Sequence, residues 1–331
     1  ASIQSAGSFF AHPPLMQVMF VVAHKAFGGN YFRLFPLLFA LVSAILLYLV
    51  VKNRINKKAA LWAIALYATS FYAVLGSLVP DVDGAILPFF FLLSVYVYDR
   101  WIDSQKLKWF LLLISSLLVG FLIKLSFVLV IGTIVADYFW SHWENITLRK
   151  VALSLTALAS FSLVYVSLLY LIQFIYPAFS LGIMFGHANQ FADNLGRNWL
   201  QIVVQGVKAV FYLSPPLLVP LLFVNKEIFR KTRMFFLYLL LGFIFYFILF
   251  DFSRGALDKY LMFVIVPLSV IPGVIFARIF ETLVLSWSSL IKPLVIGVVI
   301  SLPLVAINFF PHIVLGLYPK TEWFSRVLHG Q

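Results

Sequence analysis

Long apolar runs, separated by short polar or charged segments, fill this chain between residues 33 and 309. Each run is 15 to 25 residues long, and about 20 residues of α-helix cross the hydrocarbon of a bilayer. The pattern therefore predicts an all-α fold, a polytopic transmembrane bundle of about ten spans. The predicted helices lie at 33–51, 59–79, 84–98, 109–123, 125–140, 151–175, 200–224, 234–250, 260–277 and 293–309.

The apolar stretch from 109 to 140 is interrupted by Lys124. One long helix would cross the membrane once and would place the basic segment 225–233 on the outer side. Two half-length helices that turn near Lys124 keep that segment inside, where basic loops are enriched. We therefore predict a turn at Lys124, close to the outer face.

Residues 1–32 do not form a convincing span. His12-Pro13-Pro14 begins an apolar segment that Gln17, His24 and Lys25 interrupt, and Gly28-Gly29 follows it. Proline favours the first turn of a helix and glycine its end, so we expect a helix at 12–27 that lies in the outer interface.

This gives three predicted segments. Residues 1–32 form part of a first outer loop, 33–309 form the transmembrane domain, and 310–331 form a tail on the outer face. The chain starts with Ala1 on the predicted outer side, so we expect a transmembrane helix upstream of it.

Composition supports the membrane class and excludes a soluble globule. Of the 331 residues 63% are hydrophobic and only 11% are charged, which is far from the composition of soluble domains. The formal net charge of +12 could suggest nucleic acid as a partner. The basic residues, however, are in short loops between apolar runs rather than in a stripe on a soluble domain, so nucleic acid is not expected.

The positions of the basic residues predict the orientation. Fifteen of the 24 Lys and Arg residues fall in loops between alternate runs, and loops of this kind face the cytoplasm. The predicted cytoplasmic loops are 52–58, 99–108, 141–150, 225–233 and 278–292.

Metal-binding and disulfide chemistry have little support in the sequence. There is no cysteine, and the six histidines show no close ligand spacing such as HExxH. A protein-held zinc site is therefore not expected.

Two acids interrupt the apolar pattern between the second and third predicted helices. Asp81 and Asp83 in Pro80-Asp81-Val82-Asp83-Gly84 would be costly in hydrocarbon, so they must face water, a cavity or a partner. The alternative is a solvated turn in which one acid, most naturally Asp83, caps the helix that follows. That alternative leaves the other acid unexplained.

Other unusual residues are predicted to share this outer face. Lys124 lies among apolar residues, where a lysine needs a carboxylate, a phosphate or water, although it could instead snorkel from a helix end. His12, Arg33, Lys259 and Tyr260 lie in outer segments. Lys259-Tyr260 alone is more typical of an interfacial anchor. The convergence of all these groups indicates a functional site.

The order of these motifs resembles that of a known enzyme class. The motifs are His12-Pro13-Pro14-Leu15, Phe27-Gly28, Arg33-Leu34, the Asp81/Asp83 turn, Gly120 to Lys124, and Lys259-Tyr260 before Pro267. Together they resemble the GT-C membrane glycosyltransferases, specifically the dolichyl-phosphate-mannose mannosyltransferase and RgtA/B/C/D-like group.

The resemblance implies a glycosyltransferase in the plasma membrane of a bacterium or archaeon. Its donor would be a sugar, hexosyl or pentosyl, on a polyprenyl phosphate among the helices. Lys124, Lys259 and Arg33 would bind the donor phosphate, with His12 and Tyr260 in the same cavity. Asp81 and Asp83 would act on the acceptor hydroxyl, or would coordinate a divalent metal in members that use one.

In this family the acid most closely tied to catalysis precedes the His-Pro-Pro stretch, and we expect it upstream of Ala1. The acceptor could be a glycan, a lipid or a protein. The alternatives are a lipid-linked sugar flippase or transporter, for which the sequence shows no internal repeat, and a scaffold protein, which needs no cluster of outer charges.

Overall fold

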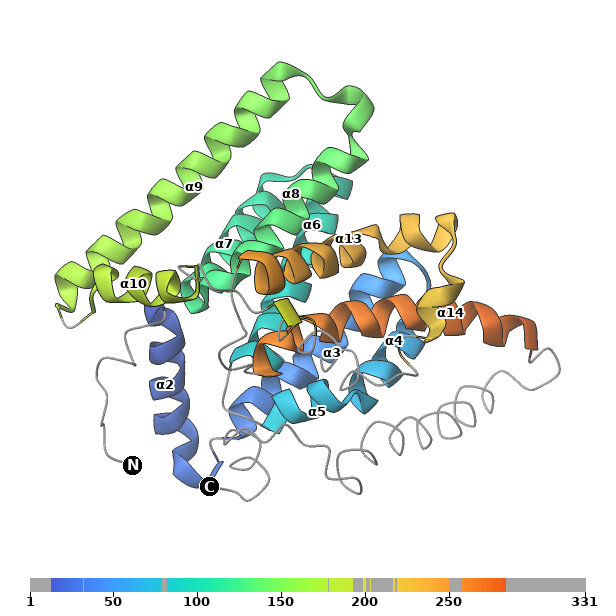
Figure 1. Ribbon diagram of the computed structural model, residues 1–331, viewed down its shortest axis with the longest axis horizontal. Coiled ribbons are helices and arrows are strands. Elements are labelled where there is room, and N and C mark those ends of the chain that lie inside the picture. The colour runs from blue at the N-terminus through green and yellow to red at the C-terminus, as the bar shows by residue number, and fades with distance from the viewer. Residues whose placement is uncertain are drawn as a thin grey trace.

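The computed structural model describes residues 13–31, 33–78, 82–177, 179–192, 199–200, 203, 217, 219–249 and 258–283. All regular structure in these residues is helical, which confirms the predicted all-α class (Figure 1). The α-helices are α2 (Pro14–Tyr31), α3 (Leu34–Arg54), α4 (Lys57–Thr69), α5 (Phe71–Leu78), α6 (Leu87–Ser104), α7 (Leu107–Ile123), α8 (Val128–Ser141), α9 (Leu148–Ile175), α10 (Leu181–Ala192), α13 (Lys226–Phe243) and α14 (Ile265–Leu283).

Shorter helical segments link several of these helices. Two are π-helical, η1 (Val82–Ile86) and η5 (Ile244–Leu249). The others are 3₁₀ turns, namely η2 (Leu125–Phe127), η3 (Trp143–Asn145), η4 (Val219–Phe223) and η6 (Asp258–Val264).

Four helical segments of the described part are long and apolar enough to cross a membrane: Leu34–Arg54, Val82–Ser104, Leu148–Ile175 and Tyr260–Ile279. A fifth would be the pair Lys57–Thr69 and Tyr72–Leu78, which is bent by 61°. The count of about ten is therefore not confirmed. The predicted helix 293–309 lies outside the described residues, as does most of 200–224.

The predicted helix at 59–79 is broken into α4 and α5. Ser70 has an extended backbone (φ −68°, ψ 128°) and ends α4, so the chain turns before α5 begins. The apolar run does not show this break because residues on both sides of it are equally hydrophobic.

Helices α3, α4, α6, α13 and α14 enclose the main core, and small residues set the distance between α4 and α14. Ala59, Ala60 and Ala63 on α4 are fully buried. A Cβ atom on Gly273 of α14 would lie only 2.8 Å from the backbone nitrogen of Ala63. Small residues let two helices approach closely enough for extensive van der Waals contact, which is the main attraction between helices in lipid.

Two ion pairs hold together the end of the bundle at which the predicted cytoplasmic loops lie. Arg54 Nε donates to Asp99 over 2.7 Å, which joins the end of α3 to α6. Arg233 Nε and Nη2 donate to Asp137 over 2.9 and 2.8 Å, which joins α13 to α8. Arg233 Nη2 also donates to Ser141 in the loop 141–150. These contacts involve four of the predicted cytoplasmic loops, as expected if those loops lie at one end.

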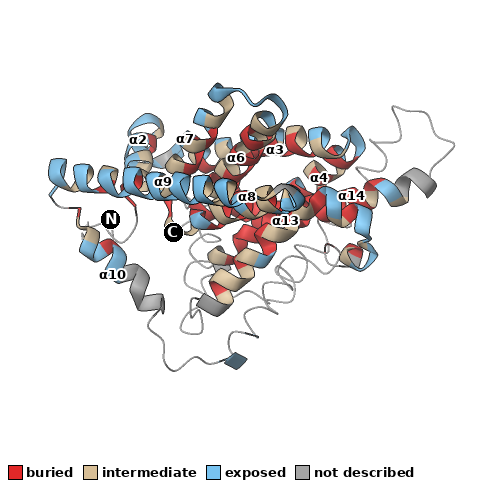
Figure 2. Cartoon of the chain, turned by 90° about the horizontal axis from the view of Figure 1, so that it is seen from above, coloured by how far each residue is buried: buried red, intermediate tan, exposed pale blue. Residues whose placement is uncertain are grey.

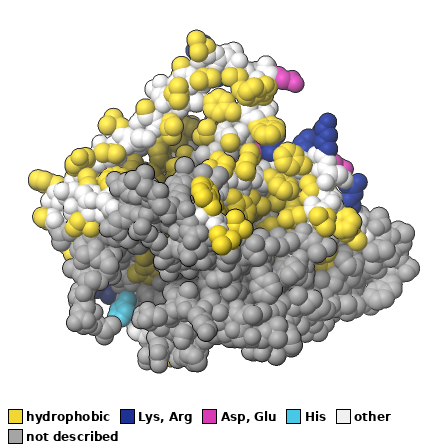
Figure 3. All heavy atoms as spheres, in the orientation of Figure 1, with side chains coloured by type: hydrophobic (Ala, Val, Ile, Leu, Met, Phe, Trp, Pro, Cys, Tyr) yellow, Lys and Arg dark blue, Asp and Glu magenta, His cyan; other side chains and the backbone are white. Residues whose placement is uncertain are grey.

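Figure 3 shows hydrophobic side chains over most of the visible described surface, with Lys and Arg gathered on one side near the start of α13. Helix α9 is the most exposed of the apolar helices (Figure 2). Only 17% of its most apolar window is buried, and Leu163, for example, is 68% exposed. An apolar helix with so little burial is suited to hydrocarbon and not to water.

The predicted interfacial helix exists as α2, at the edge of the bundle (Figure 1). It begins at Pro14, and its helical geometry breaks at Gly28, whose φ is +70°. Glycine adopts this conformation without the steric cost of a Cβ atom. Helix α2 is not among the helices apolar enough to span; its position in the interface stays a prediction.

Candidate functional site

The site is built around a buried ion pair between Asp83 and Lys124, whose side chains are in hydrogen-bonding contact. Asp83 lies in η1 and is 5% exposed, and Lys124 lies between α7 and η2 and is 7% exposed. Two opposite charges so far from water are stable only when each has the other as a partner. The alternatives of a solvated aspartate turn and of a snorkelling lysine are thus wrong for these two residues.

A tight local turn places Lys124. Its backbone is extended (φ −155°, ψ 135°) and ends α7, while its N–H donates to the Gly120 carbonyl over 3.1 Å. The Phe127 ring folds back against Gly120, where a Cβ atom would lie 2.3 Å from the ring. Gly120 thus makes room for the aromatic ring that closes the turn, and the predicted break at Lys124 is confirmed.

A second close approach places Asp83. Gly84 packs against Gly76 of α5 so tightly that a Cβ atom on Gly84 would lie 2.2 Å from the Gly76 Cα. The segment is π-helical, with one more residue per hydrogen-bonded turn than an α-helix, and such segments are frequent at functional sites. The paired glycines bring η1 inward, so that Asp83 faces the bundle and not the solvent.

Aromatic side chains complete the surroundings of the ion pair. Lys124 Nζ lies 4.5 Å from the centroid of the Tyr260 ring, and the electron-rich face of a tyrosine attracts a cation at this distance. Tyr246 of η5 stacks on Tyr260 with ring centroids 5.9 Å apart. The lysine therefore has a carboxylate and an aromatic ring as neighbours.

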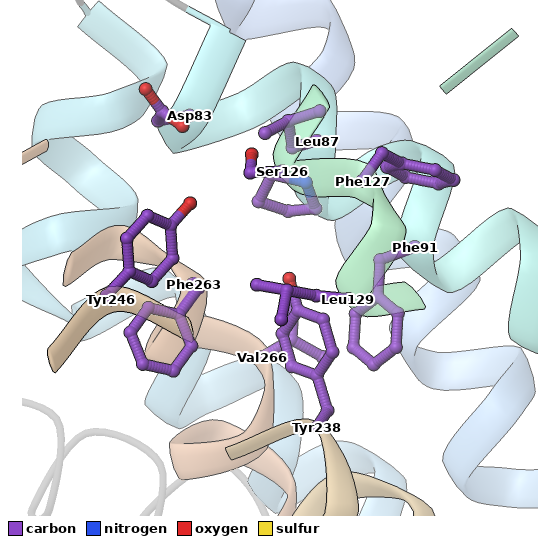
Figure 4. Close-up of a pocket in the computed structure, with 11 residues that line it drawn as sticks. Asp83, Leu87, Phe91, Ser126, Phe127, Leu129, Tyr238, Tyr246, Phe263 and Val266 are labelled. Atoms are coloured by element: carbon purple, nitrogen blue, oxygen red, sulfur yellow. The ribbon is translucent and has the colours of Figure 1, made fainter. Parts of the chain in front are cut away.

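A small cavity adjoins Asp83 (Figure 4). Its volume is about 20 Å³, which is room for about one water molecule. Its polar lining comes from Asp83, Ser126, Tyr238 and Tyr246. Apolar side chains form the rest of its wall, namely Leu87, Pro88, Phe91, Phe127, Leu129, Phe263 and Val266.

Helix α2 covers this end of the bundle. Its residues Leu15, Met16, Met19 and Phe20 pack on a buried cluster formed by Val82, Ile86 and Ile123. These three residues flank Asp83 and Lys124 in the chain. The predicted interfacial helix therefore shields the ion pair from one side.

The structure brings together Asp83, Lys124 and Tyr260 of the predicted site. Arg33 lies exposed in the turn before α3, and no contact between it and the pair is found in the described part of the chain. Lys259 lies in η6 beside Tyr260, and its side chain is outside the described residues, as are Asp81 and His12.

Sequence reasoning missed Ser126, Tyr238 and Tyr246. Both tyrosines lie within phenylalanine- and leucine-rich segments, where a tyrosine is indistinguishable from a core aromatic. Within the described residues, no three His, Asp or Glu side chains could together hold a metal ion.

Comparison with known families gives a match to the N-terminal half of the chain. Residues 11–170 match the model of the dolichyl-phosphate-mannose-protein mannosyltransferase family. This segment covers 160 of the 331 residues. It contains α2, the Asp83 turn and the Lys124 turn, so the resemblance indicated by the sequence motifs is confirmed.

Solved structures match nearly the whole chain. ArnT from Cupriavidus metallidurans bound to undecaprenyl phosphate has a TM-score of 0.59 at 15% identity, over 93% of this chain and 62% of ArnT. ArnT in the apo state has a TM-score of 0.56 at 17% identity, over 91% of this chain and 60% of ArnT. The chain thus has the GT-C fold and spans less than two thirds of these ArnT chains. No curated protein sequence matches it.

Proposed function

We propose that this protein transfers a sugar from a polyprenyl-phosphate donor to an acceptor at the outer face of the membrane. The observation that carries the proposal is the buried Asp83–Lys124 pair, which lies in the segment that matches the mannosyltransferase family model. The fold of an ArnT that was crystallised with undecaprenyl phosphate supports a lipid-phosphate donor.

The position of the pair along the helices supports the outer face. Asp83 precedes α6, whereas Asp99 near the other end of α6 binds Arg54 at the basic end of the bundle. Helical residues rise about 1.5 Å each, so the two acids are separated by about 24 Å along the helix. If the basic loops are cytoplasmic, the pair lies toward the opposite side.

The chemistry follows from the two charges. In the transfer, the acceptor oxygen forms a bond to the anomeric carbon while the bond from that carbon to the phosphate oxygen breaks. Lys124 would stabilise the negative charge on the departing polyprenyl phosphate, and Asp83 would take the proton of the acceptor hydroxyl.

We further propose roles for the other predicted site residues. Asp81 would assist Asp83. Lys259 and Arg33 would contact the phosphate, and His12 and Tyr260 would line the donor cavity.

The test measures transfer of labelled sugar from the polyprenyl-phosphate donor by the membrane-embedded protein. Lys124→Met should raise the donor KM by tenfold or more, because a charge-assisted hydrogen bond contributes about 1.5 to 3 kcal/mol. Asp83→Asn should lower kcat more than donor binding.

Lys231→Met provides the matched control, because Lys231 is an exposed lysine that pairs with Glu227 at the opposite end of the bundle. This variant should transfer the sugar at the wild-type rate. Near-wild-type transfer by both site variants would overturn the proposal. Movement of the lipid-linked sugar across the membrane of vesicles, without transfer to an acceptor, would instead favour the alternative that the protein is a flippase.

A further inference from the structure

The surface at the start of α13 carries more positive charge than its own acid neutralises. Lys226, Arg230 and Lys231 are exposed there, and Arg278 of α14 reaches the same place. Glu227 is the acidic residue on this side of α13. Its carboxylate accepts hydrogen bonds from Lys231 over 2.8 Å and from Arg278 over 3.5 Å. Four cations and one carboxylate leave an excess of positive charge on this surface.

Two of these cations, Lys226 and Arg230, have no ion-pair partner in the described part of the chain. They are four residues apart on one helix, so their side chains are neighbours, and like charges at this spacing repel each other. Arg230 is within electrostatic reach of Glu227, but other cations already share that carboxylate. Glu281 of α14, whose side chain lies outside the described residues, would balance at most one of the two charges. An anion from outside the protein would relieve the repulsion.

Exposed apolar side chains directly precede these cations in the chain. In η4, Leu222 is 84% exposed and Phe223 is 61% exposed. Their neighbours Leu221 and Val224 pack on the main core and hold the segment in place. Exposed apolar groups next to basic ones are typical of a surface at a membrane boundary, where the former reach acyl chains and the latter reach phosphates.

Trp140 of α8 indicates the same depth in the membrane. It is 54% exposed, and the centroid of its ring lies 6.3 Å from that of Phe229 in α13. Tryptophan is enriched where the hydrocarbon meets the headgroups. Figure 3 shows the basic side chains near the start of α13 with hydrophobic side chains beside them. The start of α13 is therefore at the level of the lipid phosphates.

We propose that this surface binds an anionic phospholipid. Lys226 and Arg230 contact its phosphate, and Leu222 and Phe223 pack against its acyl chains. A zwitterionic lipid fits less well, because its own cation neutralises the phosphate. A soluble anion lacks the acyl chains that the two apolar side chains need. The inference goes beyond the proposed function and does not depend on it.

The double variant Lys226→Gln, Arg230→Gln tests the inference, because it removes both charges and keeps polar side chains at the surface. The double variant Arg100→Gln, Lys108→Gln is the matched control. It also removes one arginine and one lysine from exposed positions in a predicted cytoplasmic loop, but each of these two cations lies over an aromatic ring.

The first measurement is the lipid that each protein retains in a neutral detergent, determined by native mass spectrometry. The protein is offered an equimolar mixture of phosphatidylglycerol and phosphatidylcholine with the same acyl chains. The wild type and the control should retain phosphatidylglycerol preferentially. The site variant should bind it tenfold or more weakly, because each basic residue near a membrane surface contributes about 1 kcal/mol. Equal retention of both lipids by the wild type would overturn the inference, as would an equal loss in the control.

The second measurement is thermal unfolding in the presence of each lipid. A ligand that binds only the folded state raises the unfolding temperature. Phosphatidylglycerol should therefore raise the unfolding temperature of the wild type and the control above the value in phosphatidylcholine, and should leave that of the site variant unchanged. The same rise in all three proteins would show that the lipid acts elsewhere, and would overturn the inference.

Discussion

At the residue scale, Lys124 illustrates how a charge is kept in an apolar bundle. The ammonium has the carboxylate of Asp83 on one side and the Tyr260 ring on another. Burial makes this pair sensitive to the loss of one partner, since a lone buried charge costs much more than a missing pair. This sensitivity provides a test that needs no substrate.

Asp83→Asn and Lys124→Met should each destabilise the protein by about 3 kcal/mol or more, because each removes one partner of a buried ion pair. The double variant should be more stable than the sum of the single losses predicts, since it leaves no buried charge. Thermal unfolding in detergent measures all four proteins. Strictly additive losses would show that the two side chains do not interact.

At the element scale, two short interruptions of helical geometry position the site. Lys124 ends α7 in an extended conformation, and η1 replaces the first turn of the predicted 84–98 helix. Each interruption is accompanied by a glycine in close contact with another part of the chain, Gly120 with Phe127 and Gly84 with Gly76. The breaks are therefore maintained by packing.

Gly120→Ala should destabilise the protein by about 1 to 3 kcal/mol, because the new methyl group overlaps the Phe127 ring. Gly132→Ala in α8 is the matched control. Its Cβ atom would lie 3.5 Å from Leu241, an ordinary contact, and alanine favours a helix over glycine. The midpoints of denaturant unfolding compare the stabilities of the two variants. Equal stability of both variants would contradict the described packing at the turn.

At the scale of the whole molecule, charge separates the two ends of the bundle. The Arg54–Asp99 and Arg233–Asp137 pairs lie at the end with the basic loops, while Asp83 and Lys124 lie at the far ends of α6 and α7. The same separation would orient the protein in a membrane. Single cysteines can test it because the chain has none of its own.

Lys57→Cys and Lys106→Cys should react with an impermeant maleimide only after the cells are permeabilised, since both positions are exposed in predicted cytoplasmic loops. Tyr31→Cys should react in intact cells, because Tyr31 is 65% exposed in the predicted outer loop. The inverse labelling pattern would reverse the orientation and place the ion pair on the cytoplasmic side.

The sequence by itself predicted the helical membrane class, the resemblance to the mannosyltransferase family and the break at Lys124. Each of these depends on local properties: the length of an apolar run, the order of short motifs, and a charge where no charge is tolerated. It also indicated that Lys124 and the Asp81/Asp83 turn share one face. Hydropathy could not show the bend at Ser70, because the residues on both sides are apolar.

Only the tertiary structure decided which acid pairs with Lys124 and what lies beside that acid. The partner, Asp83, is 41 positions away in the chain, and the cavity joins it to Tyr238 and Tyr246 from helices farther along. Residues so distant meet because helices pack at specific angles and distances, to which small residues such as Gly76 and Gly84 contribute. The hydrophobic pattern of one helix does not indicate which other helix packs against it.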